Sequence, residues 1–204
     1  NLMANPFYIS TAISYTNGPP HIGHAYEVIA ADAIARFKRL DGYDVFFLTG
    51  TDEHGLKVQK KAQELGIDPK KYVDEISKEF IQLSISLNCS NDDFIRTTDE
   101  RHVKNVQSIW KILFDKGDIY LDQYSGWYSI TDEAFYNEEE LIKTESNSFL
   151  SPNGNPVEWV DEESYFFRLS KYQDDLLELY EKNEKFILPS SRMNEIKNFV
   201  RSGL

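Results

Sequence analysis

The chain has 204 residues, of which 41% are hydrophobic and 27% charged, and its formal net charge is −12. This composition is typical of a globular protein with one large or two small domains, and the negative charge argues against a broad phosphate-binding surface. Any nucleic-acid partner is therefore expected to dock mainly outside this sequence. The single cysteine, Cys89, excludes an internal disulfide and a zinc site built from several cysteines.

The sequence contains no apolar run that approaches the roughly 20 residues of a membrane-spanning helix. Its first residues lack the basic and then apolar pattern of a secretory signal. We therefore expect a cytoplasmic protein with no membrane partner. The matrix of an organelle is the alternative, because a processed organellar protein would have the same composition.

The first elements predict a strand, a helix and a second strand. Residues 7–13 are aromatic or β-branched and end in turn residues, as in a strand. Apolar residues recur at helical spacing over residues 23–40, and Asp41 with Gly42 ends that helix. The apolar run at residues 45–48 suits a parallel strand buried on both faces. The pattern predicts an α/β fold with a parallel sheet, in which ligands bind beyond the carboxyl ends of the strands.

Further elements follow the second strand. Helices are predicted over residues 53–65, 69–87, 98–116 (with Thr98 as the cap), 171–182 and 192–201, a strand over 94–97, and short β segments over 119–121, 127–130, 157–160 and 165–169. The residue pattern changes after Asp118, where short aromatic runs separated by turn residues predict hairpins. We interpret this stretch as a small β-rich insertion.

The turn between the first strand and the first helix, residues 15–24, holds two of the four histidines. The helix that follows would point its unpaired N–H groups and its positive dipole end at this turn, which suits phosphate. His21 and His24 lie about one helical turn apart, so their N–H groups would both donate to phosphate oxygens. Gly23 leaves space for a flat base. The alternative is a pair of satisfied, partly exposed histidines at a helix start.

A second polar cluster, residues 49–55, follows the second strand and is expected at the same edge of the sheet. Asp52 would pair with a cationic group such as a substrate ammonium, or it would cap the next helix. His54 would act in the site or orient Asp52. These two residues and the histidines His21 and His24 have the types of metal ligands, but no spacing enforces the geometry. We therefore predict no metal site.

These motifs resemble a known family. Residues 15–24 resemble the HIGH signature of the class I aminoacyl-tRNA synthetases. Together with residues 12–15 and 49–55, they resemble the methionyl-tRNA synthetases in particular. Three later stretches are similar to the connective region of the same family, namely residues 126–128, 165–169 and 192–196. The resemblance covers nearly the whole chain.

The resemblance implies a Rossmann-like catalytic domain and a two-step ligase reaction. The carboxylate of L-methionine would attack the α-phosphate of ATP, with Mg²⁺, to give methionyl-adenylate and pyrophosphate. The acyl group would then pass to the 3′-terminal adenosine of tRNA(Met). The implied partners are L-methionine, ATP and that tRNA, which would be bound mainly by regions outside this sequence.

The resemblance also implies residue roles. The ATP-binding residues would be Asn17, His21, Gly23 and His24, and the methionine-binding residues would be Ala12, Ile13, Tyr15, Asp52 and His54. His21 and His24 would be catalytic, stabilising the triphosphate in the transition state, and Gly23 would pack against adenine. Asp52 would bind the ammonium group of methionine.

Two departures from the family pattern stand out. Family members often carry a zinc-binding knuckle with paired cysteines in the insertion, where this chain has residues 129–132 and 151–154 without any cysteine. We therefore predict no structural zinc. An aromatic cluster would hold the insertion together instead, made of Trp127, Tyr128, Phe135 and Trp159. The second departure is that the KMSKS loop of the family, which supplies a lysine to the phosphates, is absent.

The second departure indicates the N-terminal part of a longer enzyme, which alone is not expected to catalyse the reaction. Three parts are predicted: residues 1–118 as the first half of the catalytic domain, residues 119–170 as the connective insertion, and residues 171–204 as helices leading back. The alternatives are another class I synthetase, a small nucleotidylyltransferase, or a non-catalytic nucleotide-binding module. The length of the insertion counts against the nucleotidylyltransferase.

Overall fold

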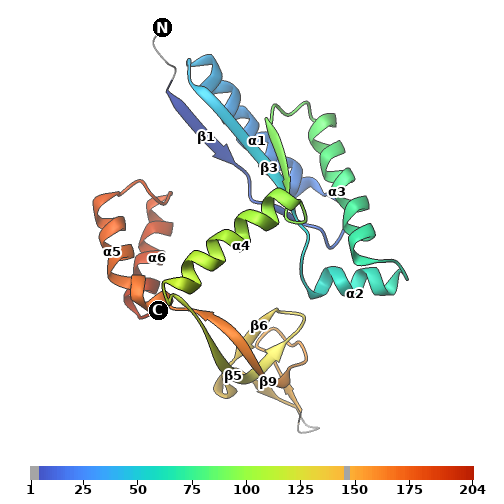
Figure 1. Ribbon diagram of the computed structural model, residues 1–204, viewed down its shortest axis with the longest axis vertical. Coiled ribbons are helices and arrows are strands. Elements are labelled where there is room, and N and C mark those ends of the chain that lie inside the picture. The colour runs from blue at the N-terminus through green and yellow to red at the C-terminus, as the bar shows by residue number, and fades with distance from the viewer. Residues whose placement is uncertain (1–4, 145–147) are drawn as a thin grey trace. The chain divides into compact units, whose positions relative to one another are not determined.

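The computed structural model describes residues 5–144 and 148–204. The chain divides into two compact units, Asn1–Val106 and Gln107–Leu204, each with its own sheet (Figure 1). The boundary between them falls inside one helix, α4 (Glu100–Asp115). The finer division into three parts stays a prediction.

The first unit alternates strands and helices. Its elements are β1 (Pro6–Ser10), β2 (Ser14–Tyr15), α1 (Ile22–Leu40), β3 (Asp44–Asp52), α2 (Leu56–Glu64), α3 (Pro69–Ser86), β4 (Asp93–Arg96) and the start of α4. All strand pairs are parallel. Leu48 in β3 pairs with Ser10 on one side and with Asp93 on the other, so β3 is the central strand. The predicted α/β fold with a parallel sheet is confirmed.

The first strand is shorter than the predicted range of residues 7–13, and a second short strand follows it. β1 ends at Ser10, and β2 covers only Ser14 and Tyr15. Between them the backbone N–H of Ala12 donates to Glu27 Oε1 on α1, at 2.7 Å, instead of to a strand. A side chain distant in sequence therefore interrupts the ladder at the place where a substrate pocket was expected.

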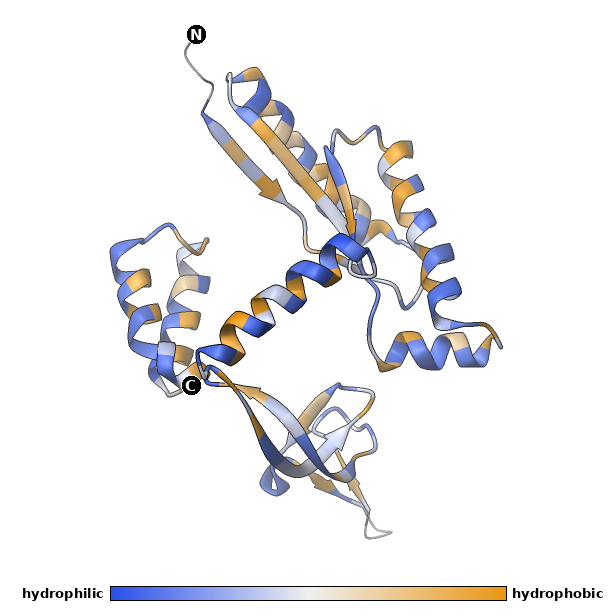
Figure 2. Cartoon of the chain, viewed as in Figure 1, coloured by the Kyte–Doolittle hydropathy of each residue, from blue (hydrophilic) through white to orange (hydrophobic). Residues whose placement is uncertain are grey.

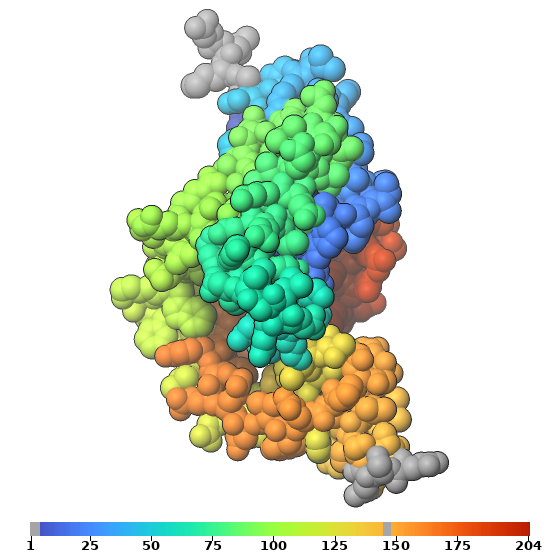
Figure 3. Space-filling model, turned by 90° about the vertical axis from the view of Figure 1, so that its right-hand side faces the viewer, coloured from blue at the N-terminus to red at the C-terminus, as the bar shows by residue number. Residues whose placement is uncertain are grey.

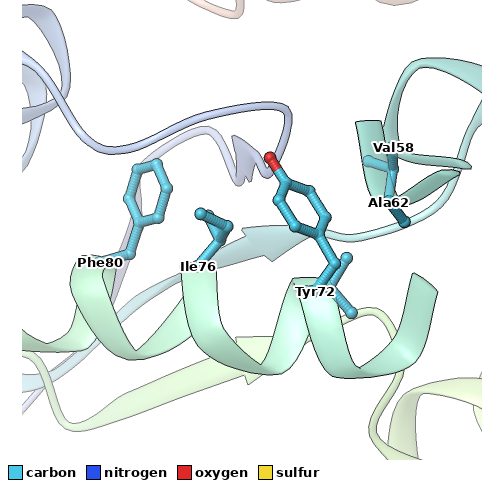
Figure 4. Packing of buried hydrophobic residues seen from close by; sticks show 6 residues of the cluster. Val58, Ala62, Tyr72, Ile76 and Phe80 are labelled. Atoms are coloured by element: carbon cyan, nitrogen blue, oxygen red, sulfur yellow. The ribbon is translucent and has the colours of Figure 1, made fainter. Parts of the chain in front are cut away.

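Two apolar clusters stabilise the first unit. The inner face of α1 packs on β3 and buries Val28, Ala31, Ala35 and Phe47. Figure 2 shows the first part of β3 as hydrophobic. The second cluster joins α2 and α3, as Figure 4 shows, with Tyr72, Ile76 and Phe80 on one side of α3 and Val58 and Ala62 facing them from α2. These two helices also form one continuous surface in Figure 3.

The second unit holds a three-stranded and a two-stranded antiparallel sheet and two helices. Besides the end of α4, its elements are β5 (Ile119–Ser129), β6 (Ala134–Tyr136), the 3₁₀ turn η1 (Glu138–Glu140), β7 (Ile142–Lys143), β8 (Phe149–Leu150), β9 (Glu158–Phe167), the 3₁₀ turn η2 (Leu169–Tyr172), α5 (Gln173–Lys182) and α6 (Ser190–Arg201). The helices pack through a core of Tyr180, Met193 and Val200. No helix in the described part of the chain is long and apolar enough to cross a bilayer.

The expectation of short β segments after Asp118 is wrong. β5 and β9 are single long strands, paired from Ile119 opposite Phe167 to Tyr128 opposite Glu158. The polar middles of the two strands, residues 122–125 and 161–164, resembled turns in the sequence. In the fold they lie opposite each other in the ladder, where exposure to water accommodates them.

The expected aromatic cluster of the insertion is split between the two faces of this sheet. Trp127 contacts Trp159, with ring centroids 5.5 Å apart, and Tyr128 contacts Phe135 at 4.7 Å. Trp127 and Tyr128 are neighbours in β5, so their side chains point to opposite faces. The rings therefore form two pairs, where the sequence predicted one cluster.

The loops at residues 129–132 and 151–155 are joined by a carboxylate. Asp132 accepts hydrogen bonds from Ser151 Oγ, from Asn155 Nδ2 at 2.7 Å and from Asn153 Nδ2 at 3.2 Å. Its own N–H donates to Ser129 Oγ. The donors are hydroxyl and amide groups, which satisfy a carboxylate and do not form the thiolate or imidazole set that zinc prefers. The absence of structural zinc stays a prediction.

Candidate functional site

The turn before α1 holds the two histidines in a reciprocal cap. His21 is the N-cap residue, and its Nδ1 accepts the N–H of Gly23 at 3.1 Å. The Nδ1 of His24 accepts the N–H of His21, also at 3.1 Å. The local sequence explains this arrangement, because the turn residues before His21 hold it in an extended conformation and the helix places His24 three positions on.

The cap assigns the tautomer of both rings. A neutral imidazole whose Nδ1 accepts a hydrogen bond carries its proton on Nε2. His21 and His24 therefore each keep an Nε2–H donor for another partner. The two rings are stacked, with centroids 3.9 Å apart, and the ring of His24 meets Phe80 edge-on at 4.9 Å. Paired donors at the positive end of a helix suit an anion.

Burial lowers the pKa of His24, the neighbouring His21 lowers it further, and Glu27 opposes the shift. His24 is therefore neutral near pH 7, in the form that the cap requires. Two other predicted ATP-site residues lie in the same turn. A side chain on Gly23 would approach the His21 ring to 2.9 Å, so the ring lies directly over this glycine. Asn17 is exposed, and no hydrogen bond to it is found among the described residues.

Asp52 ends β3 at the same edge of the sheet. Its backbone pairs with Tyr15, and its C=O accepts both the N–H and the hydroxyl of Thr16 at 3.1 Å. The alternative that Asp52 caps the next helix is wrong, because α2 starts after Gly55 without any side-chain cap. The Asp52 carboxylate has no hydrogen-bond or ion-pair partner among residues 5–144 and 148–204. It is available for a cation.

Gly55 and Tyr15 meet beside this carboxylate. Gly55 has φ of 125°, a conformation that side chains rarely adopt. A Cβ on Gly55 would also lie 2.5 Å from the Tyr15 hydroxyl oxygen. The glycine thus allows the tyrosine to sit against the chain, with its ring packed on the α2–α3 cluster.

Glu53, which sequence reasoning missed, organises the chain between Asp52 and His54. Its side chain is fully buried and binds Arg96 through two contacts, Nε to Oε1 at 2.7 Å and Nη2 to Oε2 at 2.9 Å. The same carboxylate accepts the hydroxyls of Thr51, Ser77 and Thr98 at 2.5–2.7 Å. Thr98 is therefore bound to Glu53 and does not cap α4 as expected.

Burial alone would raise the pKa of Glu53, but the hydrogen bonds from Arg96, Ser77, Thr51 and Thr98 outweigh it and lower that pKa. The ion pair is part of a larger network, because Arg96 also binds Asp74 on α3 at 2.5 Å. The ends of β3 and β4 are thereby tied to α3. A single acidic residue in a polar stretch carries no periodic signal, so the sequence did not reveal this role.

His54 takes its position from the same network. The N–H of Glu53 donates to Thr97 Oγ1 at 2.9 Å, and that oxygen lies 3.1 Å from His54 Nδ1. No bond between His54 and Asp52 is found in the described part of the chain. The imidazole is exposed and faces Thr97.

A small cavity lies beside His24. It has a volume of about 20 Å³, room for about one water molecule. Its lining includes Ala12, His24 and Glu27, together with Thr49 and Gly50 of β3. Glu27, which sequence reasoning also missed, lies one helical turn after His24, a spacing that could have revealed it. Ile13 does not line the cavity and is 40% exposed.

The structure thus brings a pair of N–H donors and an unpaired carboxylate to one edge of a parallel sheet. The chain is also similar to a known protein family. A family model described as tRNA synthetases class I (M) matches residues 7–149. This is more than half of the chain, so the chain belongs to that family of class I tRNA synthetases.

Similar proteins include methionine–tRNA ligases. That of Rhizobium meliloti (strain 1021) is 58% identical over 200 residues, which are 98% of this chain and 39% of the relative. That of Listeria monocytogenes serovar 1/2a is 55% identical over 207 residues, covering 98% of this chain and 31% of the relative.

A solved structure, Mycobacterium tuberculosis methionyl-tRNA synthetase in complex with methionyl-adenylate, matches with a TM-score of 0.91 and 51% identity. The match covers 98% of this chain and 39% of that chain. The chain therefore spans about two fifths or less of the length of these proteins.

Proposed function

We propose that this chain forms the part of a methionine–tRNA ligase that binds ATP and L-methionine and joins them. The observation that carries the proposal is the unpaired Asp52 carboxylate at the same sheet edge as the stacked histidines. An amino acid carries a cation next to the carboxylate that must meet the phosphate. A site with an acceptor for the cation and donors for the phosphate fits this substrate pair.

The histidines would act on the triphosphate. In the first step an oxygen of the methionine carboxylate bonds to the α-phosphorus of ATP, and the bond to the bridging oxygen breaks to release pyrophosphate. Negative charge on the phosphate oxygens grows in the transition state. The Nε2–H groups of His21 and His24 would donate there, and the cap holds both rings ready before substrate binds. Asn17 and Gly23 would complete the ATP site.

Methionine would lie along the broken first strand. Asp52 would bind its ammonium group, and Ala12, Ile13 and Tyr15 would surround its side chain, with His54 nearby. The thioether offers only a weak acceptor, so selection rests largely on shape. Glu27 holds the Ala12 backbone in place.

Mg²⁺ would accompany the triphosphate. Among the described residues no group of three His, Cys, Asp or Glu side chains could hold a metal by itself. Mg²⁺ commonly binds through substrate phosphates with few protein ligands, which is compatible with this site. In the second step the acyl group would pass to tRNA(Met), which the acidic chain is expected to contact only in part. The cytoplasmic location stays a prediction.

Amino-acid-dependent ATP–pyrophosphate exchange tests the proposal. It is measured on the protein expressed from its complete reading frame, with each of the amino acids in turn. We expect exchange with methionine alone. His21→Ala and His24→Ala should each lower kcat by about 10²–10³-fold, as loss of a transition-state donor does. Asp52→Asn should raise KM for methionine much more than KM for ATP.

The outcomes separate the alternatives. Exchange with a different amino acid would retain the class I mechanism and overturn the methionine site. No exchange from folded, ATP-binding protein would leave the nucleotide-binding module as the explanation. Glu163→Gln, an exposed charge change in the second unit, serves as the control and should leave exchange unchanged.

A further inference from the structure

The second unit has a groove on one face of its sheet, independent of the proposed reaction. Its volume is about 300 Å³, and its lining consists of Tyr124, Phe135, Glu162, Ser164, Tyr165 and Phe166. Tyr124 lies opposite Glu162 in the β5–β9 ladder, and Asp122 lies opposite Ser164. Opposite residues share a face, so both carboxylates stand on the face that carries the groove.

The aromatic rings of this face form a continuous series. Tyr124 meets Phe135 edge-on at 4.4 Å and Phe166 at 5.9 Å, and Phe166 meets Tyr120 at 5.9 Å. Gly126 makes room for the first pair, since a Cβ there would lie 3.1 Å from Tyr124 and 3.3 Å from Phe135. Tyr124 and Phe135 remain 37% and 39% exposed, so a ligand can reach them.

Among the described residues, neither Glu162 nor Asp122 forms an ion pair. Within the described ranges, Glu162 accepts a hydrogen bond only from the Ser164 hydroxyl, at 3.3 Å, and Asp122 only from the N–H of Gln123. No lysine or arginine in the described ranges pairs with either. The groove therefore combines electron-rich ring faces with uncompensated negative charge, which is the chemistry that binds organic cations.

The same face already holds one guanidinium. The Arg168 side chain lies over the ring of Tyr120, with Cζ 4.4 Å from the centroid. Tyr120 is the last ring of the series and lies next to Phe166, which lines the groove. A guanidinium thus stacks on Tyr120 at one end of the series. Among the described residues, no cation stacks on Phe135 at the other end.

We propose that this groove binds an arginine side chain of a partner protein. A flat guanidinium stacks on rings and donates to a carboxylate at once, which an ammonium does less well. Nucleic acid is disfavoured because the groove and the chain are both acidic. The same face of a second copy is disfavoured as the occupant, because it would carry the same carboxylates as the groove. Charge complementarity selects a basic protein segment.

The test uses the protein expressed from its complete reading frame and a short peptide with one central arginine, followed by NMR. We expect the resonances of Tyr124, Phe135 and Glu162 to shift, and a matched peptide with citrulline, which is neutral and of the same shape, to leave them in place. Glu162→Gln should weaken the arginine peptide about fivefold to tenfold. Glu163→Gln removes the same charge from the next position in β9, on the opposite face, and should change nothing.

Three results would overturn the proposal. The first is equal binding of the citrulline peptide, or equal weakening by both variants. The second is tighter binding of spermidine than of the arginine peptide, seen as displacement of the peptide by a lower concentration of spermidine. This result would make a free polyamine the occupant. The third is a dimer in sedimentation experiments that Glu162→Gln dissociates, which would make a second copy the occupant.

Discussion

Glu53 in the first unit and Asp132 in the second each bind several segments through one carboxylate. They differ in the partners that stabilise the negative charge. Glu53 is fully buried and has a charged partner, Arg96, besides its hydroxyl donors. Asp132 is half-buried and is bound by neutral hydroxyl and amide donors. A fully buried charge needs a counter-ion, whereas a carboxylate that still touches water is satisfied by hydrogen bonds.

Arg96→Ala should have the largest effect. It removes the counter-ion and leaves Glu53 charged and buried, so we expect a loss of about 3–5 kcal/mol in the free energy of unfolding. Urea unfolding measures this loss. Arg101→Ala is the control, because its pair with Asp93 is exposed and should contribute at most about 1 kcal/mol. Similar losses for both variants would mean that Glu53 does not depend on its counter-ion.

Asp132→Ala should have a smaller and more local effect. It leaves Ser151 and Asn155 without their acceptor and should loosen the two loops of the second unit, with the parallel sheet unchanged. Hydrogen exchange, read residue by residue, measures the difference. Asp122→Ala, an exposed change in the same unit, is the control. Faster exchange throughout the first unit would contradict the local role.

A fall in pH should lower the stability that each of the two carboxylates, Glu53 and Asp132, contributes. The hydrogen bond from Ser151, with those from Asn155 and Asn153, lowers the pKa of Asp132 from its ordinary 3.8 to about 2. A carboxyl whose pKa is lowered by folding contributes stability above its unfolded pKa, and loses it as the pH falls through the folded pKa. Stability should therefore decline from pH 3.8 towards about 2.

The acid dependence should be shallower in Asp132→Asn, which cannot titrate. Chemical unfolding at a series of pH values measures the slope. An unchanged slope in this variant would show that other groups carry the acid response. Glu53, whose pKa is also lowered, should add to the decline in the first unit.

We expect the smallest effect on stability from His24, a base that is only partly buried. Burial lowers its pKa below 6.5, so the folded state binds its proton less readily than the unfolded chain. Its contribution to stability is present above pH 6.5 and falls as the pH falls below that value. NMR titration of its ring should give a midpoint below 6.5. A midpoint above that value would show that Glu27 outweighs burial and His21.

The sequence by itself determined the parallel α/β fold, the helix after the histidine turn and the family, because these depend on local periodicity and on a contiguous motif. It also indicated Asp52, since a polar residue directly after a buried strand must lie at the edge of the sheet where ligands bind. The spacing of three between His21 and His24 allows their reciprocal cap, but the cap itself is a finding of the structure.

Only the tertiary structure decided the rest. The break after Ser10 depends on Glu27, the burial of Glu53 depends on Arg96 from β4, and the length of β5 depends on β9. Each of these is a contact between residues far apart in the chain. A pattern read along the sequence reports which side chains are apolar, and it carries no information about which polar side chain will find which partner across the fold.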